Sequence, residues 1–142
     1  MKIAVRYYSK SGNTKKIACA IADAVGTTAN TTDEPIAEQV DVLFLGGALY
    51  AGGIDVHLRD YIKKLTPAQV KSIAVFSTAA GGKSIQPHVA GLLNGTGITI
   101  SGDGFSCKGK FLFINLGRPN EQDCSDAVAY AKAIMEKLHL LE

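Results

Sequence analysis

The sequence has no tryptophan and only three cysteines among its 142 residues. Cys19, Cys107 and Cys124 are odd in number, far apart and without a Cys-x-x-Cys pair, which argues against a disulfide framework and a zinc site. No apolar run approaches the roughly 18 residues of a membrane span, so we expect none. An arginine follows the first three apolar residues, too early for a secretory signal. These features favour a reduced, cytoplasmic protein.

The sequence also has little excess of either charge, because it contains 15 lysines and arginines and 13 aspartates and glutamates. Nucleic-acid-binding domains usually carry a clustered basic stripe, and the longest basic clusters here are pairs, so nucleic acid is not an expected partner. With 46% apolar and 20% charged residues, the composition is that of a folded protein. The length suits one domain over residues 1–142, with a single sizeable core.

Buried strands and amphipathic helices alternate along the chain. Apolar segments predict strands at 2–8, 27–32, 40–45, 70–76 and 98–100 and an extended piece at 111–116. Apolar residues spaced three and four apart predict helices at 14–25, 55–65, 84–94 and 120–140. This alternation predicts a parallel sheet covered by helices on both faces. Such sheets bind ligands beyond the carboxyl ends of their strands, which points to the loops 9–14, 46–54 and 77–83.

The loop 9–14, Ser-Lys-Ser-Gly-Asn-Thr, joins the first strand directly to the first helix. The first N–H groups of a helix lack partners within it, and the helix dipole places partial positive charge there. Three hydroxyls and an amide add donors, and the glycine lets a bound group come close to the backbone. The loop therefore predicts an anion cradle suited to phosphate. It is neither a Walker loop nor Gly-x-Gly-x-x-Gly, and an ordinary strand–helix turn rich in capping residues is the alternative.

Residues 7–18, Tyr-Tyr-Ser-Lys-Ser-Gly-Asn-Thr-Lys-Lys-Ile-Ala, resemble the phosphate loop of the flavodoxin family, whose usual pattern is Thr/Ser-x-Thr/Ser-Gly-x-Thr. The similarity covers almost the whole chain, because 46–53 and 77–82 stand where flavodoxins have their second and third flavin loops. The segments 105–111 and 117–123 are similar to stretches of short bacterial flavodoxin-like proteins. The resemblance implies a three-layer α/β/α sandwich, with a five-stranded parallel sheet in the order 2-1-3-4-5, and one non-covalent FMN.

The resemblance also implies which residues hold the FMN. The hydroxyls and backbone donors of the first loop would bind the phosphate, and Tyr50 would stack on the isoalloxazine ring. A carbonyl of Gly52 or Gly53 would turn toward flavin N5, and residues 78–82 would line the pyrimidine edge. The complete set is Ser9, Lys10, Ser11, Gly12, Asn13 and Thr14 in the first loop, Ala48, Leu49, Tyr50, Ala51, Gly52 and Gly53 in the second, and Ser77, Thr78, Ala79, Ala80, Gly81 and Gly82 in the third.

More than one function is compatible with this resemblance. We expect a monomeric electron carrier that serves redox partner proteins. The alternative is an FMN-dependent oxidoreductase acting on a quinone or similar acceptor, because residues 47–65 also look like those of menaquinone-dependent protoporphyrinogen oxidases. Carrier flavodoxins are usually acidic, whereas the isoelectric point here is near 8.4. The third loop has no aromatic side chain either, which leaves one flavin face to small or aliphatic residues and would admit a substrate.

A cofactor-free signalling domain of the flavodoxin type is a third possibility. A receiver domain is disfavoured, because Ser9-Lys10-Ser11 and Gly46-Gly47 stand where it would need acidic residues. His57 is a candidate proton donor near the flavin, with a solvent-facing position in the first turn of its helix as the alternative.

The cysteines carry structural predictions of their own. We expect Cys19 in the core, on the apolar face of the first helix. Cys107 is a candidate oxidation site, exposed beside lysines that would lower its pKa, with an unreactive loop cysteine as the alternative.

Overall fold

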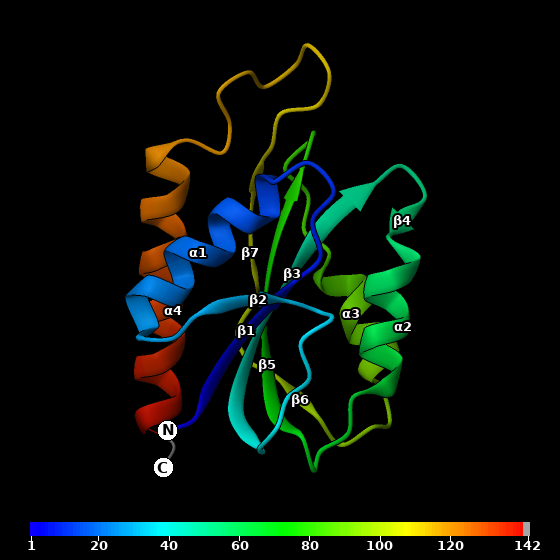
Figure 1. The fold of residues 1–142 in the computed structure, drawn as a ribbon, viewed down its shortest axis with the longest axis vertical. Helices are drawn as coiled ribbons and strands as arrows, with labels where there is room; N and C mark the ends of the chain where they lie inside the picture. Colours follow the sequence, from blue (N-terminus) through cyan, green and yellow to red (C-terminus); the bar gives the residue numbers. More distant parts are fainter. Residues whose placement is uncertain (141–142) are drawn as a thin grey trace.

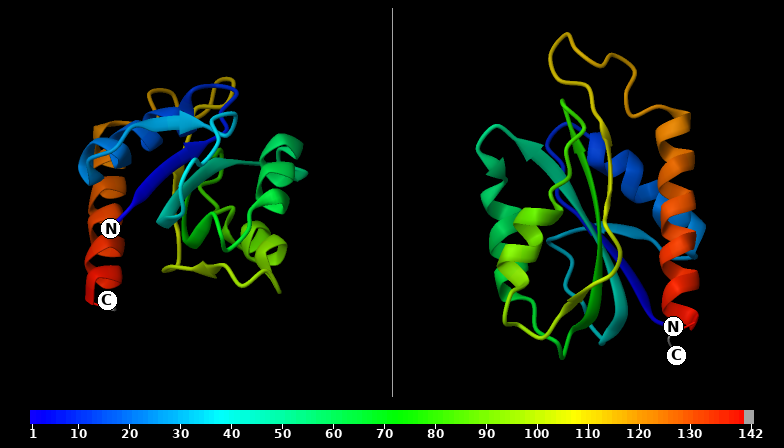
Figure 2. Two further views of the ribbon diagram at one scale, coloured as in Figure 1. Left: turned by 60° about the horizontal axis from the view of Figure 1, so that its bottom comes forward. Right: turned by 180° about the vertical axis from the view of Figure 1, so that it is seen from behind.

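The computed structural model describes residues 1–140 as a central sheet with two helices on each face (Figures 1 and 2). One face is covered by α1 (Asn13–Val25) and α4 (Glu121–Leu140), which pack against each other. The other face is covered by α2 (Val56–Lys64) and α3 (Gln86–Leu93). The N-terminus and the C-terminal end of α4 lie at the lower end of the molecule in Figure 1, and the strands β3 and β5 point to the upper end.

The parallel strands follow the predicted order. The sheet runs β2 (Ala29–Thr31), β1 (Ile3–Tyr7), β3 (Val40–Tyr50) and β5 (Val70–Ala79). The strand beside β5 comes in two pieces, β6 (Thr99–Ile100) and β7 (Phe105–Lys108), both parallel to β5. We count β6 and β7 as one strand and leave out β4, which is antiparallel. The five parallel strands, numbered along the chain, then lie in the order 2-1-3-4-5, which confirms the predicted fold. The short β4 (Gly53–Ile54) adds an antiparallel hairpin to β3.

Two apolar layers enclose the sheet, because alternate residues of each central strand point to opposite faces. On one face, Leu43 and Leu45 of β3 belong to the same buried cluster as Leu58 and Ile62 of α2. On the other face, Val42, Phe44 and Phe76 pack with residues of α1 and α4. The continuous apolar segments of the sequence are therefore strands buried on both sides, as predicted.

Arg6, the charged residue within β1, is buried. Its guanidinium donates hydrogen bonds to the carbonyl oxygens of Glu34 at 3.0 Å and of Pro35 and Val5 at 3.1 Å. Burying a cation is costly unless its donors are satisfied, and here three backbone oxygens satisfy them.

The predicted helix ends are confirmed. Gly26, with φ +79°, caps the C-terminus of α1 and donates its N–H to the carbonyl of Ala22. The carboxylate of Asp55 caps α2 by accepting the N–H of His57 at 2.7 Å. Before α4, Asn120 and Asp123 each accept the other's backbone N–H, at 2.9 and 2.8 Å.

The strands β3 and β5 continue further than the sequence predicted, into segments that we expected to be loops. The pair Gly46-Gly47 does not end β3, because its glycines are required by packing within the strand. A Cβ on Gly46 would meet the ring of Phe76, and one on Gly47 would meet Leu58. The predicted loop 46–54 is consequently the end of β3 and its hairpin with β4, and β5 continues to Ala79.

At the edge of the sheet, the predicted strand 98–100 is confirmed as β6, and the prediction for 111–116 was wrong. The segment 111–116, expected to be extended, contains a tight turn in which Phe111 and Ile114 exchange both backbone hydrogen bonds, at 3.1 and 3.0 Å. The strand is instead β7, whose sequence Phe-Ser-Cys-Lys has a weak apolar pattern. Its pairing with Phe76–Ala79 of β5 defines it, and that long-range contact is not visible in the local sequence.

Candidate functional site

A cleft of about 510 Å³ lies beyond the carboxyl ends of β1, β3, β5 and β7, at the upper end of Figure 1. Its volume falls within the range of small-molecule and cofactor sites. Four segments line it: Lys10, Ser11 and Asn13 after β1; Ala48, Leu49, Tyr50 and Ala51 at the end of β3; Thr78, Ala79 and Ala80 at the end of β5; and Gly109, Lys110 and Phe111 after β7.

The structure thus brings together ten of the predicted site residues, with at least three from each predicted loop. The other eight predicted residues do not line the cleft. They are Ser9, Gly12, Thr14, Gly52, Gly53, Ser77, Gly81 and Gly82.

The first loop presents an open helix start. Gly12 precedes α1 with φ +89°, a left-handed conformation that favours glycine, and no side chain caps the helix. The N–H of Gly12 donates to the hydroxyl of Ser9 at 3.0 Å, so this hydroxyl already serves inside the loop. The space that a Cβ on Gly12 would occupy is empty to 4 Å. The loop therefore has the form of an anion cradle whose first helical N–H groups have no capping side chain.

Two predicted residues lie below the cleft. Thr14 is buried, and its hydroxyl is 3.0 Å from that of Thr78, whose residue lines the cleft. Ser77 is fully buried and turned away, because its hydroxyl accepts the N–H of Ile85 at 3.2 Å and donates to the carbonyl of Phe105 at 3.4 Å. Thr14 thus ties the start of α1 to the end of β5, and Ser77 ties β5 to α3 and β7.

Tyr50 and Lys10 form one wall of the cleft. Tyr50 is 38% exposed, and the ammonium of Lys10 lies 5.3 Å from the centroid of its ring. The same ammonium is 3.0 Å from a carboxylate oxygen of Asp55. Leu49 and Tyr50 pair with Ile54 and Gly53, so residues 51 and 52 make the turn between β3 and β4. The pairing of β3 with β4 thus holds the backbone of Tyr50, and Lys10, itself paired with Asp55, holds its ring.

Charge interactions around Asp55 stabilise this wall. Burial acts to raise the pKa of the Asp55 carboxyl, but hydrogen bonds from the His57 N–H, from Lys10 and from the His57 ring outweigh it and lower the pKa. The hydrogen bond to Asp55 raises the pKa of Lys10, and burial raises the pKa of Tyr50. Lys10 is consequently held as a cation, and Tyr50 as a neutral phenol, at the cleft.

His57 lies in the first turn of α2 and faces solvent, which was the alternative given for it. Its side chain is 68% exposed, its Nδ1 is 2.8 Å from Asp55, and its ring stacks on Tyr8 at 5.1 Å between centroids. The residue supports the Asp55 cap and does not line the cleft.

Sequence reasoning missed the fourth segment, 109–111. The side-chain amide of Asn13 donates to the carbonyl of Lys110 at 3.0 Å, and a Cβ on Gly109 would lie 2.7 Å from that amide nitrogen. The N–H of Gly109 donates to the carbonyl of Ala79 at 3.1 Å. Phe111 therefore reaches the cleft through contacts between β7, β5 and α1, whereas the sequence showed only a Lys-Gly-Lys-Phe stretch.

The prediction for Cys19 was wrong, and for Cys107 the unreactive alternative holds, although the residue lies in a strand and not in a loop. Cys19 is exposed, because the buried face of α1 passes through Ile17, Ala18 and Ile21. Cys107 is buried in β7, and this burial raises the pKa of its thiol to about 12, so the neighbouring lysines do not activate it.

Residues 4–90, more than half of the chain, match the family model of the flavodoxin domain. The chain belongs to the flavodoxin family. Solved flavodoxins are similar over their whole length. One from the domain Archaea has a TM-score of 0.80 at 18% identity and covers 98% of this chain and 99% of its own. The oxidised flavodoxin 2 from Bacillus cereus has a TM-score of 0.73 at 21% identity and covers 96% and 99%.

Two further relatives bear on this flavodoxin-family chain. A flavoprotein from Lactobacillus acidophilus, solved in complex with FMN, has a TM-score of 0.59 at 18% identity and covers 73% of this chain and 91% of its own. An uncharacterized protein of Methanocaldococcus jannaschii is 29% identical over 96% of this chain and 99% of its own length. Across residues 1–140, no helix is long and apolar enough to cross a membrane, and no three His, Cys, Asp or Glu side chains form a group that could hold a metal ion.

Proposed function

We propose that this chain binds one FMN in the cleft and acts as a monomeric, cytoplasmic electron carrier between redox partner proteins. One observation carries the proposal: a single cleft joins the uncapped start of α1 to two aromatic side chains, Tyr50 and Phe111. FMN has matching parts, an anionic phosphate and a flat aromatic ring. The solved complex of a related flavoprotein with FMN supports the choice of ligand.

The phosphate would lie at the start of α1. Free N–H groups and the positive end of the helix dipole favour an anion there. The side chains of Ser11 and Asn13 line the cleft beside them, and Lys10 adds a positive charge. Gly12 leaves its surroundings open to 4 Å, so the backbone is accessible to a phosphate oxygen.

The ring would lie between the ends of β3 and β7. Tyr50 comes from β3 and Phe111 follows β7, and the small residues Ala79 and Ala80 of the intervening strand leave room between them. The ammonium of Lys10 lies over the Tyr50 ring, and this contact would hold the ring in place for stacking on the flavin. Phe111 would supply the second aromatic contact that the third loop lacks, and it would exclude water from that side.

When bound, FMN supplies the electron-transfer chemistry, and the chain's residues bind it and orient it. The pair of Thr14 and Thr78 holds the start of α1 against the end of β5, which fixes the distance between the phosphate cradle and the ring site. Asp55 keeps Lys10 in place beside Tyr50. The buried Cys107 takes no part, because its thiol remains protonated.

A titration of the apo-protein with FMN and with riboflavin, followed by flavin fluorescence, tests the proposal. Riboflavin has the same ring and no phosphate, so it isolates the cradle at α1. We expect FMN to bind at least about 100-fold more tightly, since several charge-assisted hydrogen bonds would be lost with the phosphate. Equal affinities would contradict the phosphate site, and no uptake of either flavin would contradict the function.

The oxidoreductase alternative is separated from the carrier by the kinetics of re-oxidation. The FMN-loaded protein is reduced under anaerobic conditions and mixed with a soluble quinone at increasing concentration. A carrier without a quinone site should give a rate that rises linearly with quinone concentration. A rate that saturates indicates a quinone complex and favours the oxidoreductase.

A further inference from the structure

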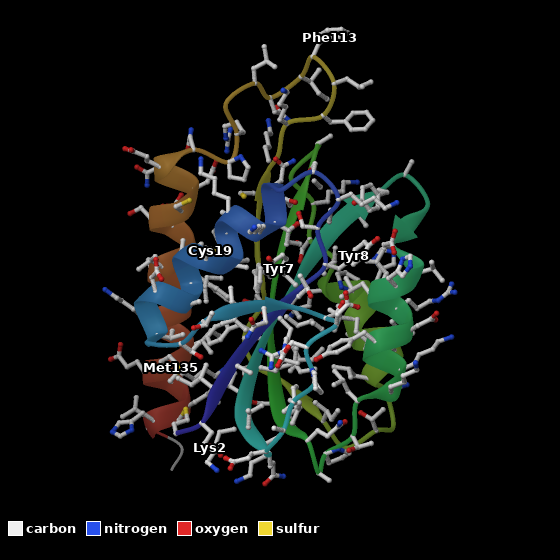
Figure 3. All side chains as sticks on the ribbon, viewed as in Figure 1. Lys2, Tyr7, Tyr8, Cys19, Phe113 and Met135 are labelled. Carbon is white, nitrogen blue, oxygen red and sulfur yellow. The ribbon has the colours of Figure 1, made fainter. Side chains whose placement is uncertain are left out.

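An exposed apolar projection stands at the cleft end of the molecule. We call residues 111–116 the apolar tip, because all of them except Asn115 are large apolar residues and more than half exposed. Phe113 is 90% exposed and Leu112 71%, and Figure 3 shows Phe113 at the far end of the molecule. Single exposed apolar residues are common in proteins, whereas a contiguous group marks an interaction surface.

Hydrogen bonds hold the backbone of the apolar tip in place. Its turn closes through the two hydrogen bonds between Phe111 and Ile114, which satisfy four backbone groups internally. The amide of Asn115 points inward and donates to the carbonyls of Ala80 at 2.7 Å and Gly109 at 3.2 Å. Behind the turn, the N–H of Lys110 donates to the carbonyl of Arg118 at 2.9 Å. The backbone groups of Phe111 and Ile114 and the side-chain amide of Asn115 are thus hydrogen-bonded within the protein, and the exposed side chains of the segment are hydrocarbon.

Positive charge surrounds this projection. The segments 8–16, 50–55, 80–85 and 108–120 build this end of the molecule, and they hold seven lysines and arginines against one carboxylate, Asp55. Asp55 is paired with Lys10, and Asp123, at the nearby start of α4, is paired with Arg118 at 2.7 Å. Two further carboxylates lie close by, Glu121 at the start of α4 and Asp126, which lines a shallow groove together with Lys108 and Arg118. We call Lys83, Lys108 and Lys110 the basic collar, because none of them forms an ion pair with any residue in 1–140.

We propose that the apolar tip and the basic collar dock this protein on an anionic lipid surface. Apolar side chains at the apex can enter the acyl boundary while lysines behind them reach the headgroups. A protein partner is less well matched, since binding hot spots are rich in tryptophan, tyrosine and arginine, and the exposed tip offers phenylalanine, leucine and isoleucine without a polar handle. Internal pairing of the turn also lowers the cost of removing its backbone from water.

Docking in this manner would bring the mouth of the cleft to the lipid surface, because Phe111 belongs both to the apolar tip and to the cleft lining. The proposal goes beyond electron transfer in solution. It does not depend on FMN, so its failure and that of the proposed function are distinguishable.

Flotation of the apo-protein with vesicles tests the proposal. One set of vesicles contains phosphatidylcholine alone, and the other also contains phosphatidylglycerol. We expect binding to the anionic vesicles only. The variant Phe113→Asp should lower the partition coefficient by about tenfold or more, because a large apolar side chain is lost. Lys110→Gln should lower it about fivefold, the effect of one basic residue near such a surface.

The matched control is Leu140→Asp. Leu140 is 79% exposed at the far end of α4, so the same change of character is made at the opposite end of the molecule. Binding should be unchanged in this variant, and FMN affinity should be unchanged in Phe113→Asp. Absence of binding by the wild-type protein, or equal losses in both aspartate variants, would overturn the proposal. A wild-type dimer that Phe113→Asp converts to a monomer, without vesicle binding, would assign the apolar tip to a second copy of the chain and also overturn it.

Discussion

The two ends of the sheet differ in how completely their charges are satisfied. At the amino end, the Lys2 ammonium is 2.6 Å from Glu38, and the Lys71 ammonium is 3.2 Å from Asp41. Asp41 also accepts the backbone N–H of Lys2 at 2.8 Å. At the carboxyl end, the basic collar has no carboxylate partners within the described chain, and an apolar cleft and the apolar tip stand beside it. The carboxyl end, where the lysines of the basic collar have no carboxylate partners among residues 1–140, is therefore the end suited to binding an anionic ligand or surface.

Helix α1 shows the same contrast within one element. Both its ends carry a glycine with positive φ, +89° at Gly12 and +79° at Gly26. At Gly26 the chain closes on itself, because the N–H groups of Gly26 and Thr27 donate to the carbonyl of Ala22. At Gly12 no side chain caps the helix. Glycine thus closes the C-terminus of α1 at position 26, whereas at position 12 it leaves the first N–H groups of the helix open to an anion.

The largest effect is expected from replacing each of these glycines by aspartate. Gly12→Asp should weaken FMN binding by about 100-fold, since it places a negative charge where the phosphate would lie. Gly26→Asp is the control, because it introduces the same backbone strain and the same charge at the other end of α1, also with open space around it. Both variants should lose stability in urea unfolding, and Gly26→Asp should lose more, because a negative charge is favourable at the N-terminal end of a helix dipole and unfavourable at its C-terminal end. A similar loss of FMN affinity in both would show that strain, and not the cradle, governs binding.

A smaller effect is expected at the ion pair that anchors the carboxyl-end loop. Arg118 donates two hydrogen bonds of 2.7 Å to Asp123, whose side chain is only 7% exposed. Asp123→Ala should lower the free energy of unfolding by about 2 kcal/mol, less than for a fully buried pair because Arg118 is partly exposed. Asp126→Ala, one turn of helix further, is the control and should have little effect, because Asp126 bonds only Gln122 at the surface.

The same pair gives a pH dependence. Hydrogen bonds from Arg118 lower the pKa of Asp123 in the folded state. Its contribution to stability is therefore complete above the ordinary carboxyl pKa of about 4 and is lost as the pH falls through the lower, folded value. Urea unfolding at a series of acidic pH values should show wild-type stability falling in this range more steeply than that of Asp123→Asn. Parallel curves would mean that the pair does not link protonation to folding.

The smallest of these effects is expected at the ring site. Tyr50→Ala should weaken FMN binding by about tenfold, since an aromatic contact and its buried area are lost. Tyr50→Phe retains the aromatic face and should bind within about twofold of the wild type. Fluorescence titration measures both, and flavin fluorescence should be less quenched in the alanine variant. Equal affinity and quenching in all three proteins would rule out stacking on Tyr50.

Most of the fold could be predicted from the sequence, because its signals are local. Strand burial, helix periodicity and the caps at Gly26 and Asp55 depend on neighbours a few residues away, and all are confirmed. The first piece of the edge strand, β6, could be predicted, but the second piece could not, because β7 is defined by pairing with β5 and the more apolar segment 111–116 is exposed. The end of β3 was misplaced for a similar reason, since Gly46 and Gly47 accommodate Phe76 and Leu58 from other elements.

The candidate site also has a part that could be predicted from local sequence and a part that could not. The first loop could be predicted because its motif is contiguous and its helix follows directly. The pairing of Lys10 with Asp55, and the arrival of Phe111 at the cleft, depend on the packing of distant segments. The predicted strand ends contributed the positions of the second and third loops, and the resemblance to flavodoxins contributed the roles of their residues. It did not contribute the aromatic side chain from the fourth.

We propose that FMN binds at the carboxyl end of the sheet and leaves the amino end unaffected. Hydrogen–deuterium exchange of the apo-protein, measured with and without FMN, tests this most directly. We expect slower exchange in 9–16, 48–54 and 109–117 on FMN addition, with unchanged exchange in 36–41 and 66–70. Protection spread equally over both ends, or confined to the amino end, would contradict it.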